Sequence, residues 1–189
     1  SSSTPIWSVN RPNLGSCYSV SISADGQYIA FGCNDGDGDT SSPNLQFFSR
    51  DSGTPIWEKE TSAAYVDVSF NGSLVAVGTG GTTGSHELQL YGRYNNTPIW
   101  SDSWSGGVTY VAISDDGKYI LASGEESVNG KNLVLFNGNI QKIEAEGEVS
   151  MITFNKTTIN LSGLSTKTTS EPKIQETPSI RVMHCMQEK

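Results

Sequence analysis

Three aspartates that alternate with glycine, Asp35, Asp37 and Asp39, carry the most specific chemistry in this sequence. Carboxylates at this spacing can fold around a hard cation, as the first residues of calcium-binding loops do. The EF-hand pattern then requires glycine at its sixth position and glutamate at its twelfth, where this chain has Thr40 and Gln46. An EF-hand is therefore excluded. A looser calcium loop and a flexible acidic turn remain as the two interpretations.

Residues for catalysis are few. The chain has two histidines, His86 and His184, and it contains no Gly-x-Ser-x-Gly elbow and no Cys-x-x-Cys pair. A nucleophile, a base and an acid that could act together cannot be assembled from the sequence. We therefore predict that the protein is not an enzyme and, calcium aside, that it carries no cofactor.

The three cysteines allow at most one internal disulfide. Cys17 and Cys33 flank a predicted hairpin turn at Asp25–Gly26. They face each other if the turn has five residues and miss by one if it has four. A disulfide and two buried thiols therefore remain open, with Cys185 free in either case.

Several features suggest an extracellular or cell-surface protein. The charged fraction is only 17%, a texture common in secreted proteins. The chain begins at Ser1 without a methionine, from which we expect a processed or excised chain but infer no compartment. Asn-x-Ser/Thr sequons, which also arise by chance, mark four candidate glycosylation sites: Asn71, Asn95, Asn155 and Asn160.

Charge and hydropathy argue against nucleic acid binding and against a membrane-spanning helix. The net charge is -8 and lysine and arginine do not cluster, which opposes binding to a phosphate backbone. No apolar run approaches the roughly 18 residues that a membrane-spanning helix needs. We expect neither nucleic acid binding nor a membrane span.

Internal repeats indicate the fold. The tetrapeptide Thr-Pro-Ile-Trp occurs three times, at Thr4–Trp7, Thr54–Trp57 and Thr97–Trp100. A second element pairs apolar runs around an Asx-Gly turn and occurs at Val20–Ala30, Val68–Ala76 and Val111–Leu121. A third element is a short apolar strand, present at Leu45–Phe48, Leu88–Tyr91, Leu133–Phe136 and, more weakly, Ile180–Met183. A period of about 45 residues built from short strands is typical of β-propeller blades.

We predict an all-β chain with one domain over residues 1–189, an antiparallel propeller of about four blades with four strands each. The predicted blades cover about 14–60, 61–103, 104–146 and 147–185, and residues 4–10 add the outer strand of the last blade. This exchange would remove exposed sheet edges and close the ring, with Thr4–Asn10 beside Ser179–Cys185. The alternative is a fragment of a propeller with six to eight blades.

The Ser-x-Asp-Gly-x-Tyr-Ile turn, the Leu-x-Leu strand and the Trp-bearing strand together resemble WD-repeat and PQQ-like propeller repeats, especially those of archaeal and bacterial surface proteins. The stretch Arg50–Trp57 is similar to the tryptophan-docking motif of PQQ-like blades. This resemblance implies that Trp7, Trp57 and Trp100 pack between blades. The Gly-His and Trp-Asp pairs of true WD repeats are missing, so a WD-type tetrad is not expected. The resemblance implies a fold and little about activity.

The acidic residues gather on one predicted face, where the loops between second and third strands and between blades emerge. These residues are Asp35, Asp37, Asp39, Glu58, Glu60, Asp102, Glu125, Glu126, Glu144, Glu146 and Glu148. Trp104 follows Trp100 and could add an aromatic contact to this face or cover a blade edge. We therefore expect a secreted or surface-displayed binding or structural module that uses the acidic face for a protein, glycan or cationic partner. The alternative is a blade array from a larger quinone- or metal-dependent propeller enzyme, or from a receptor.

Overall fold

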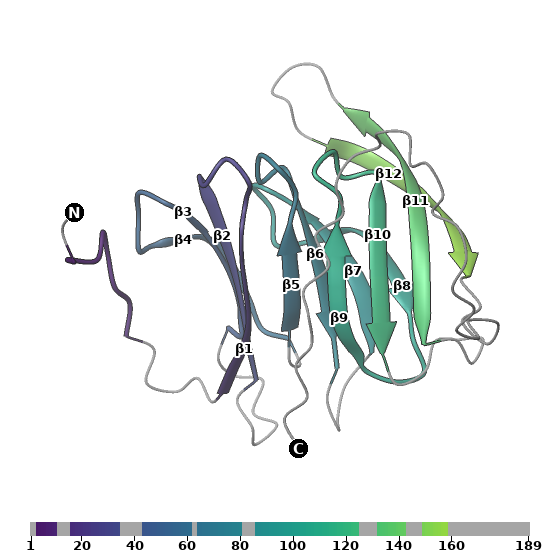
Figure 1. Cartoon of the computed structure of the whole chain (residues 1–189), viewed down its shortest axis with the longest axis horizontal. Coiled ribbons are helices and arrows are strands. Elements are labelled where there is room, and N and C mark those ends of the chain that lie inside the picture. Colours follow the sequence, from purple (N-terminus) through teal and green to yellow (C-terminus); the bar gives the residue numbers. More distant parts are fainter. Residues whose placement is uncertain are drawn as a thin grey trace, which may run out of the picture.

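The computed structural model describes residues 3–10, 16–34, 43–61, 64–80, 86–124, 132–142 and 149–158. These residues form three four-stranded antiparallel sheets that stand side by side (Figure 1). The first sheet has the strands β1 (Ser16–Ile22), β2 (Tyr28–Asn34), β3 (Leu45–Ser49) and β4 (Pro55–Lys59). The second has β5 (Ala64–Val68), β6 (Leu74–Thr79), β7 (Glu87–Gly92) and β8 (Pro98–Ser103). The third has β9 (Val108–Ile113), β10 (Tyr119–Gly124), β11 (Leu133–Lys142) and β12 (Val149–Thr158).

The first hairpin of each sheet closes through the same glycine turn. Gly26, Gly72 and Gly117 have φ values of 69°, 69° and 74°, which L-residues with a Cβ adopt only with strain. Three residues before each glycine, a serine backbone N–H donates across the turn, as Ser23 does to the oxygen of Tyr28 at 2.9 Å. The Asx-Gly signals of the sequence therefore mark the hairpins correctly.

The sheets pack face to face through apolar side chains that alternate along the strands. Between the first and second sheets, the core consists of Ala30, Leu45, Phe47, Trp57, Val66, Val68, Val75, Val77 and Tyr91. Between the second and third sheets, it consists of Leu74, Ala76, Leu88, Leu90, Trp104, Val108, Ile113, Ile120, Ala122, Val134 and Phe136. The second sheet is therefore covered on both of its faces. Burial of each larger side chain stabilises the fold by about 1.5–3 kcal/mol.

Polar contacts join the first strands of the three sheets. The carboxylate of Asp67 on β5 accepts from the hydroxyl of Ser21 on β1 at 2.7 Å and from the backbone N–H of Ile113 on β9 at 2.9 Å. The glycine turns are also linked, because Asp25 N–H donates to Phe70 O at 3.1 Å and Phe70 N–H donates to Asp115 O at 3.0 Å. One carboxylate and two backbone bonds thus hold the three sheets in register.

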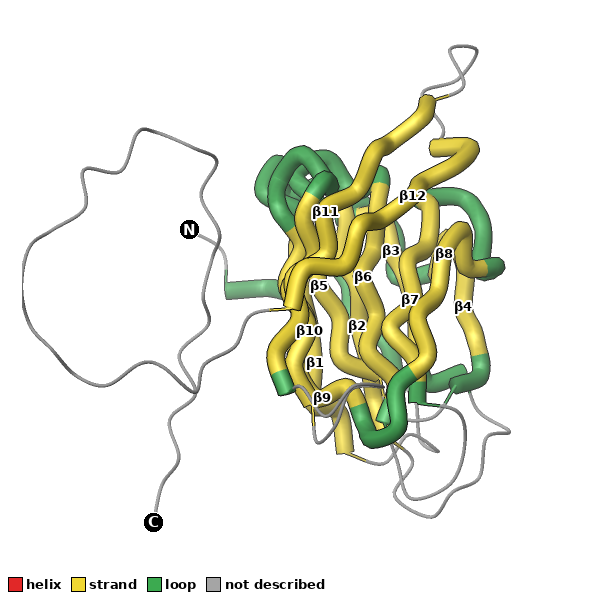
Figure 2. The backbone as a smooth tube through the Cα atoms, turned by 90° about the vertical axis from the view of Figure 1, so that its right-hand side faces the viewer, coloured by secondary structure: helices red, strands yellow, loops and turns green. Residues whose placement is uncertain are grey.

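The third sheet differs from the sequence-based division into blades. The predicted boundary placed Val149–Phe154 in a fourth blade, whereas β12 pairs along β11 as the outer strand of the third sheet. The pairing runs from Val134 opposite Thr158 to Lys142 opposite Val149, so β11 continues past Gly138. Figure 2 shows that this hairpin reaches beyond the ends of the other strands. Backbone pairing over nine residue pairs, with one register shift after Gln141, is the physical reason for the difference.

The chain ends of the predicted ring are only partly described. Residues 3–10 lie beside the first sheet and are not a strand of it. Their predicted partner, Ser179–Cys185, lies outside the described residues. No helix long and apolar enough to cross a membrane occurs in the described parts of the chain.

Candidate interaction surface and inter-sheet contacts

Trp57 fills the space between the first and second sheets. Its ring stacks on Phe47 of its own sheet, with 5.3 Å between ring centroids, and on Tyr91 of the next sheet, at 5.4 Å. The indole N–H donates to the backbone oxygen of Arg93 at 2.9 Å. This position combines a large buried apolar surface with a satisfied polar group, the arrangement that stabilises a buried tryptophan.

Trp7 makes the same two contacts one sheet earlier. Its indole N–H donates to the oxygen of Arg50 at 2.6 Å, and its ring stacks on Phe48 at 5.4 Å. Arg50 follows β3 as Arg93 follows β7. Trp7 therefore contacts the first sheet as Trp57 contacts the second.

Trp100 also reaches the following sheet, where its ring meets Phe136 edge-on at 5.2 Å. Trp57 and Trp100 thus each contact the sheet that follows their own. Trp7, whose segment is not a strand of any described sheet, contacts the first sheet.

The end of the three sheets that carries the turns at Gly26, Gly72 and Gly117 is called the glycine-turn end. An aromatic and cationic cluster lies there. The Arg93 guanidinium lies 4.3 Å from the ring centroid of Tyr28 and 5.5 Å from that of Tyr94. It also donates from Nη2 to the backbone oxygen of Asn71 at 2.5 Å. Arg93 therefore ties the first and second sheets together and holds the ring of Tyr94 beside the turn. Cation–π contacts of this kind contribute about 0.5–2 kcal/mol.

Two large side chains of this end face solvent. Phe70 is 50% exposed and Tyr94 is 57% exposed. The backbone of Phe70 is fixed on both sides by the bonds between turns. Neither residue is among the candidate site residues that the sequence indicated. The available signal was Phe70 itself, which occupies the turn position that Ala24 and Asp115 hold in the other repeats.

Two aspartates in the turns are held in the charged form. The hydroxyl of Ser23 donates to Asp25 at 2.6 Å and lowers the pKa of Asp25 below its ordinary value of 3.8. Partial burial acts to raise the pKa of Asp116, but hydrogen bonds from Ser114 and Lys118 outweigh it and the net shift is downward. These carboxylates are caps of the hairpin turns.

A buried polar chain runs through the second sheet. The Tyr91 hydroxyl donates to Gln89 at 2.5 Å, and the Gln89 amide donates to the carboxylate of Glu87. Burial raises the pKa of Tyr91 well above its ordinary value, and the negative charge of Glu87 adds to the shift. Lys59 lies over the Tyr91 ring at 5.5 Å. The chain leaves Tyr91 protonated and structural.

Most of the predicted acidic face lies outside the described residues, including Asp35, Asp37, Asp39, Glu125 and Glu126. The described part of the chain contains no group of three metal-ligating side chains. Glu58 lies on the outer strand β4 opposite Gln46, and Asp102 lies on the outer strand β8 opposite Leu88.

Trp104 lies in the core between the second and third sheets and is 5% exposed. Its backbone N–H donates to the oxygen of His86 at 2.8 Å. The ring therefore does not add a contact to the acidic face, which was one of the two places that the sequence left open for it. The hydrophobic packing of a large ring between sheets decides its place.

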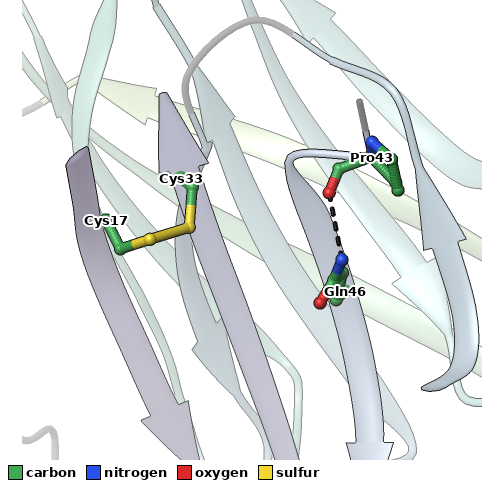
Figure 3. The surroundings of a disulfide bond; sticks show 4 residues. All are labelled: Cys17, Cys33, Pro43 and Gln46. Atoms are coloured by element: carbon green, nitrogen blue, oxygen red, sulfur yellow. Dashed lines mark hydrogen bonds between the residues drawn. A yellow bond between two sulfur atoms is a disulfide. The ribbon is translucent and has the colours of Figure 1, made fainter. Parts of the chain in front are cut away.

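A disulfide joins Cys17 on β1 to Cys33 on β2, with 4.0 Å between the Cα atoms (Figure 3). From Ile22 to Ser19 the register would place Cys17 opposite Asn34. A β-bulge between Cys17 and Ser19 moves Cys17 opposite Cys33. The turn by itself leaves the two cysteines one residue out of register, and the bulge restores their pairing.

Of the sequons, Asn71 and Asn95 lie in exposed turns at the glycine-turn end, each with its side-chain oxygen accepting from a backbone N–H two residues on. Asn155 lies in β12, and Asn160 lies outside the described residues.

Comparisons with known proteins give structural neighbours only. No protein-family model matches the sequence, and no curated protein matches it. A chain in the crystal structure of the mitotic checkpoint complex superposes with a TM-score of 0.52 at 19% identity, over 74% of this chain and 38% of that one. The structures that this protein resembles are propeller-type proteins built from antiparallel sheets. The fold is a β-propeller.

Two further neighbours are similar over comparable lengths. One is KlHsv2 with loop 6CD replaced by a Gly-Ser linker, with a TM-score of 0.46 and 17% identity over 75% of this chain and 45% of that chain. The other is a chain of the nidogen/laminin complex, with a TM-score of 0.49 and 9% identity over 68% of this chain and 46% of that chain. The chain thus spans less than half the length of each of these three structures. Each four-stranded sheet is a blade, and Trp57 and Trp100 pack between neighbouring blades.

Proposed function

We propose that this propeller is a non-enzymatic protein-binding module whose binding surface lies at the glycine-turn end. The proposal rests on the exposed aromatic pair Phe70 and Tyr94. Backbone hydrogen bonds to the neighbouring turns fix the position of Phe70. Aromatic and arginine side chains dominate the binding energy of protein interfaces, and Arg93 lies beside this pair. Because the turns are bonded to one another, the surface needs little ordering upon binding.

A capture experiment with a matched control tests this surface. The full chain, immobilised, is exposed to an extract of its source organism, beside the variant Phe70→Ser/Tyr94→Ser. Tyr110→Ser is the control, because Tyr110 is also 57% exposed but lies on β9. We expect a protein that is retained by the parent and by the control and at least tenfold less by the double variant. Equal retention by all three would exclude this surface.

We further propose an extracellular or cell-surface location. The disulfide supports it, since such bonds persist in oxidising compartments, and so do the exposed sequons at Asn71 and Asn95. Glycans on these two residues would stand beside Phe70 and Tyr94 and would limit the size of the partner. Peptide mapping of the native protein for glycans at Asn71 and Asn95, and for a Cys17–Cys33 linkage, tests this location.

The acidic loop face is a second candidate surface, for calcium or for a basic protein or glycan partner. The net charge of -8 supports it, because converging carboxylates repel one another and a cation relieves that repulsion. Millimolar calcium should then raise the melting temperature. Asp37→Asn should reduce that rise more than Asp116→Asn, a carboxylate of the glycine-turn end. Equal responses of the two variants would exclude the calcium loop.

The alternative of a blade array from a larger propeller enzyme or receptor has one supporting observation, an apolar face of the first blade that no described blade covers. We propose a binding role ahead of a catalytic one because the sequence offers no set of nucleophile, base and acid.

A further inference from the structure

The three glycine turns place one exposed residue each in a row that crosses the blades. Two positions before its glycine, each turn has an exposed residue, which is Ala24, Phe70 or Asp115. The turns share the same backbone hydrogen bonds, so these three side chains leave the backbone in equivalent directions. Phe70 O accepts from Asp25 N–H at 3.1 Å, and Phe70 N–H donates to Asp115 O at 3.0 Å. Phe70 therefore lies between Ala24 and Asp115.

The carboxylate of Asp115 differs from the other carboxylates of the glycine-turn end. Those others are engaged, Asp51 with Arg50 at 3.2 Å, Asp116 with Lys118 at 3.5 Å and Asp25 with the hydroxyl of Ser23 at 2.6 Å. Within the described parts of the chain, no cation pairs with Asp115 and no hydrogen bond reaches its carboxylate. A half-exposed aromatic ring and a carboxylate without a partner thus lie on adjacent blades, joined through their backbones.

We propose that Phe70 and Asp115 together bind a lysine or arginine side chain of the partner protein. This inference rests on the proposed function and gives the chemistry of the partner. Lysine and arginine carry a charged head on an apolar stem, so the stem packs along the ring of Phe70 while the head meets the carboxylate of Asp115. The face of an aromatic ring also attracts a cation. Ala24, on the other side of Phe70, is too small to cover the ring.

The cations of the protein itself are held away from this position. The Arg93 guanidinium lies over Tyr28 at 4.3 Å and donates to the backbone oxygen of Asn71 at 2.5 Å. Lys118 is paired within its own turn. The net charge of -8 attracts a basic partner, and a partner without a cation would cover Asp115 and leave its charge unpaired. Charge complementarity therefore favours a basic segment over an acidic or purely apolar one.

Two capped peptides that differ in one side chain test this specificity. Acetyl-Leu-Lys-Leu-amide and acetyl-Leu-Gln-Leu-amide are titrated into the full chain, and NMR follows the backbone amides of Phe70 and Asp115. We expect the lysine peptide to bind about fivefold more tightly than the glutamine peptide. A rise in salt from about 10 mM to about 150 mM shortens the Debye length from roughly 30 Å to roughly 8 Å and should remove most of this difference. Equal binding of the two peptides at low salt overturns the proposal.

Matched variants assign the effect to the two residues. Asp115→Asn should weaken the lysine peptide about threefold and leave the glutamine peptide unchanged. Asp51→Asn is the control, because it removes the same charge from the same end of the protein at a carboxylate that Arg50 already holds. Phe70→Leu keeps an apolar contact but removes the aromatic face, and should weaken the lysine peptide about threefold. Equal effects of Asp115→Asn and Asp51→Asn mean that net charge alone attracts the peptide, which overturns the proposal.

The capture experiment separates this inference from the proposed function. A partner that is lost from Phe70→Ser/Tyr94→Ser and weakened by Asp115→Asn supports both. A partner that is lost from the double variant but retained by Asp115→Asn as strongly as by the parent leaves the binding surface in place and overturns the cation site. Melting temperatures of all variants, which we expect to match the parent because the replaced side chains are exposed, show that each variant is folded.

Discussion

The indole nitrogen of Trp57 lies 2.9 Å from the backbone oxygen of Arg93, a bond that crosses from the outer strand of the first blade to the turn after the third strand of the second. The side chain of Arg93 returns to the first blade, where its guanidinium lies over Tyr28. The two residues thus connect the same two blades in opposite directions. Their substitution should loosen the contact between blades before it affects the strands within either blade.

Replacement of Trp57 tests this connection. Trp57→Ala should lower the free energy of unfolding by about 3–5 kcal/mol, since it leaves a cavity between Phe47 and Tyr91. Trp57→Phe keeps a ring but removes the N–H, and we expect an intermediate loss. Denaturant unfolding measures both. A loss below about 1 kcal/mol for Trp57→Ala would show that Trp57 does not hold the two blades together.

The glycine turns offer a comparison between two positions of equal φ. Gly26 and Gly72 both have φ of 69°, so alanine is strained at either one. A Cβ at Gly26 meets nothing within 4 Å, whereas a Cβ at Gly72 would collide with the ring of Tyr28. Gly26→Ala should cost about 1 kcal/mol and Gly72→Ala clearly more, as measured by thermal unfolding. Equal losses would mean that Tyr28 and Arg93 move aside without penalty.

Asp67 should stabilise the three first strands together. Asp67→Ala removes the acceptor for Ser21 and for the backbone N–H of Ile113, and we expect it to lower the free energy of unfolding by about 1–3 kcal/mol. Asp67→Asn keeps one acceptor and should lose less. Amide hydrogen exchange at Ile113 should quicken in Asp67→Ala. Unchanged exchange there would argue against the bridge.

The capped aspartates predict a loss of stability in acid. Because the folded pKa of Asp25 and that of Asp116 lie below 3.8, their contribution is present above that pH and disappears as the pH falls through the folded-state values. Ser23→Ala removes the main cause for Asp25 and should raise the pKa of Asp25 while that of Asp116 stays unchanged. NMR titration of the carboxyl carbons measures both. A shift of the two residues together would contradict local capping.

The disulfide should contribute by restricting the unfolded chain. Cys33 lies 16 positions after Cys17 in the sequence, and closing a loop of this size corresponds to about 3 kcal/mol. Cys17→Ser/Cys33→Ser should therefore melt at a lower temperature than the parent. Reductant should lower the melting temperature of the parent toward that of the variant and leave the melting temperature of the variant unchanged. A parent that does not respond to complete reduction would show that the bond adds no stability.

The sequence by itself determined the blade fold, because each repeat carries local signals that act within a few residues. The Asx-Gly turns specify the hairpins through positive φ, and alternating apolar residues specify faces that must be buried. The repeated Trp at positions 7, 57 and 100 also marked the contacts between sheets, since a large ring recurring at one point of a repeat has to pack in the same way each time.

Tertiary structure decided what depends on register and on distant neighbours. The bulge after Cys17 brought the two cysteines opposite each other, and the long pairing of β11 with β12 moved a strand into the third blade. Packing between sheets buried Trp104, while the bonds between turns left Phe70 on the surface. None of these follows from residue type, because a bulge shifts a register by one residue and exposure depends on which segment of the chain lies opposite.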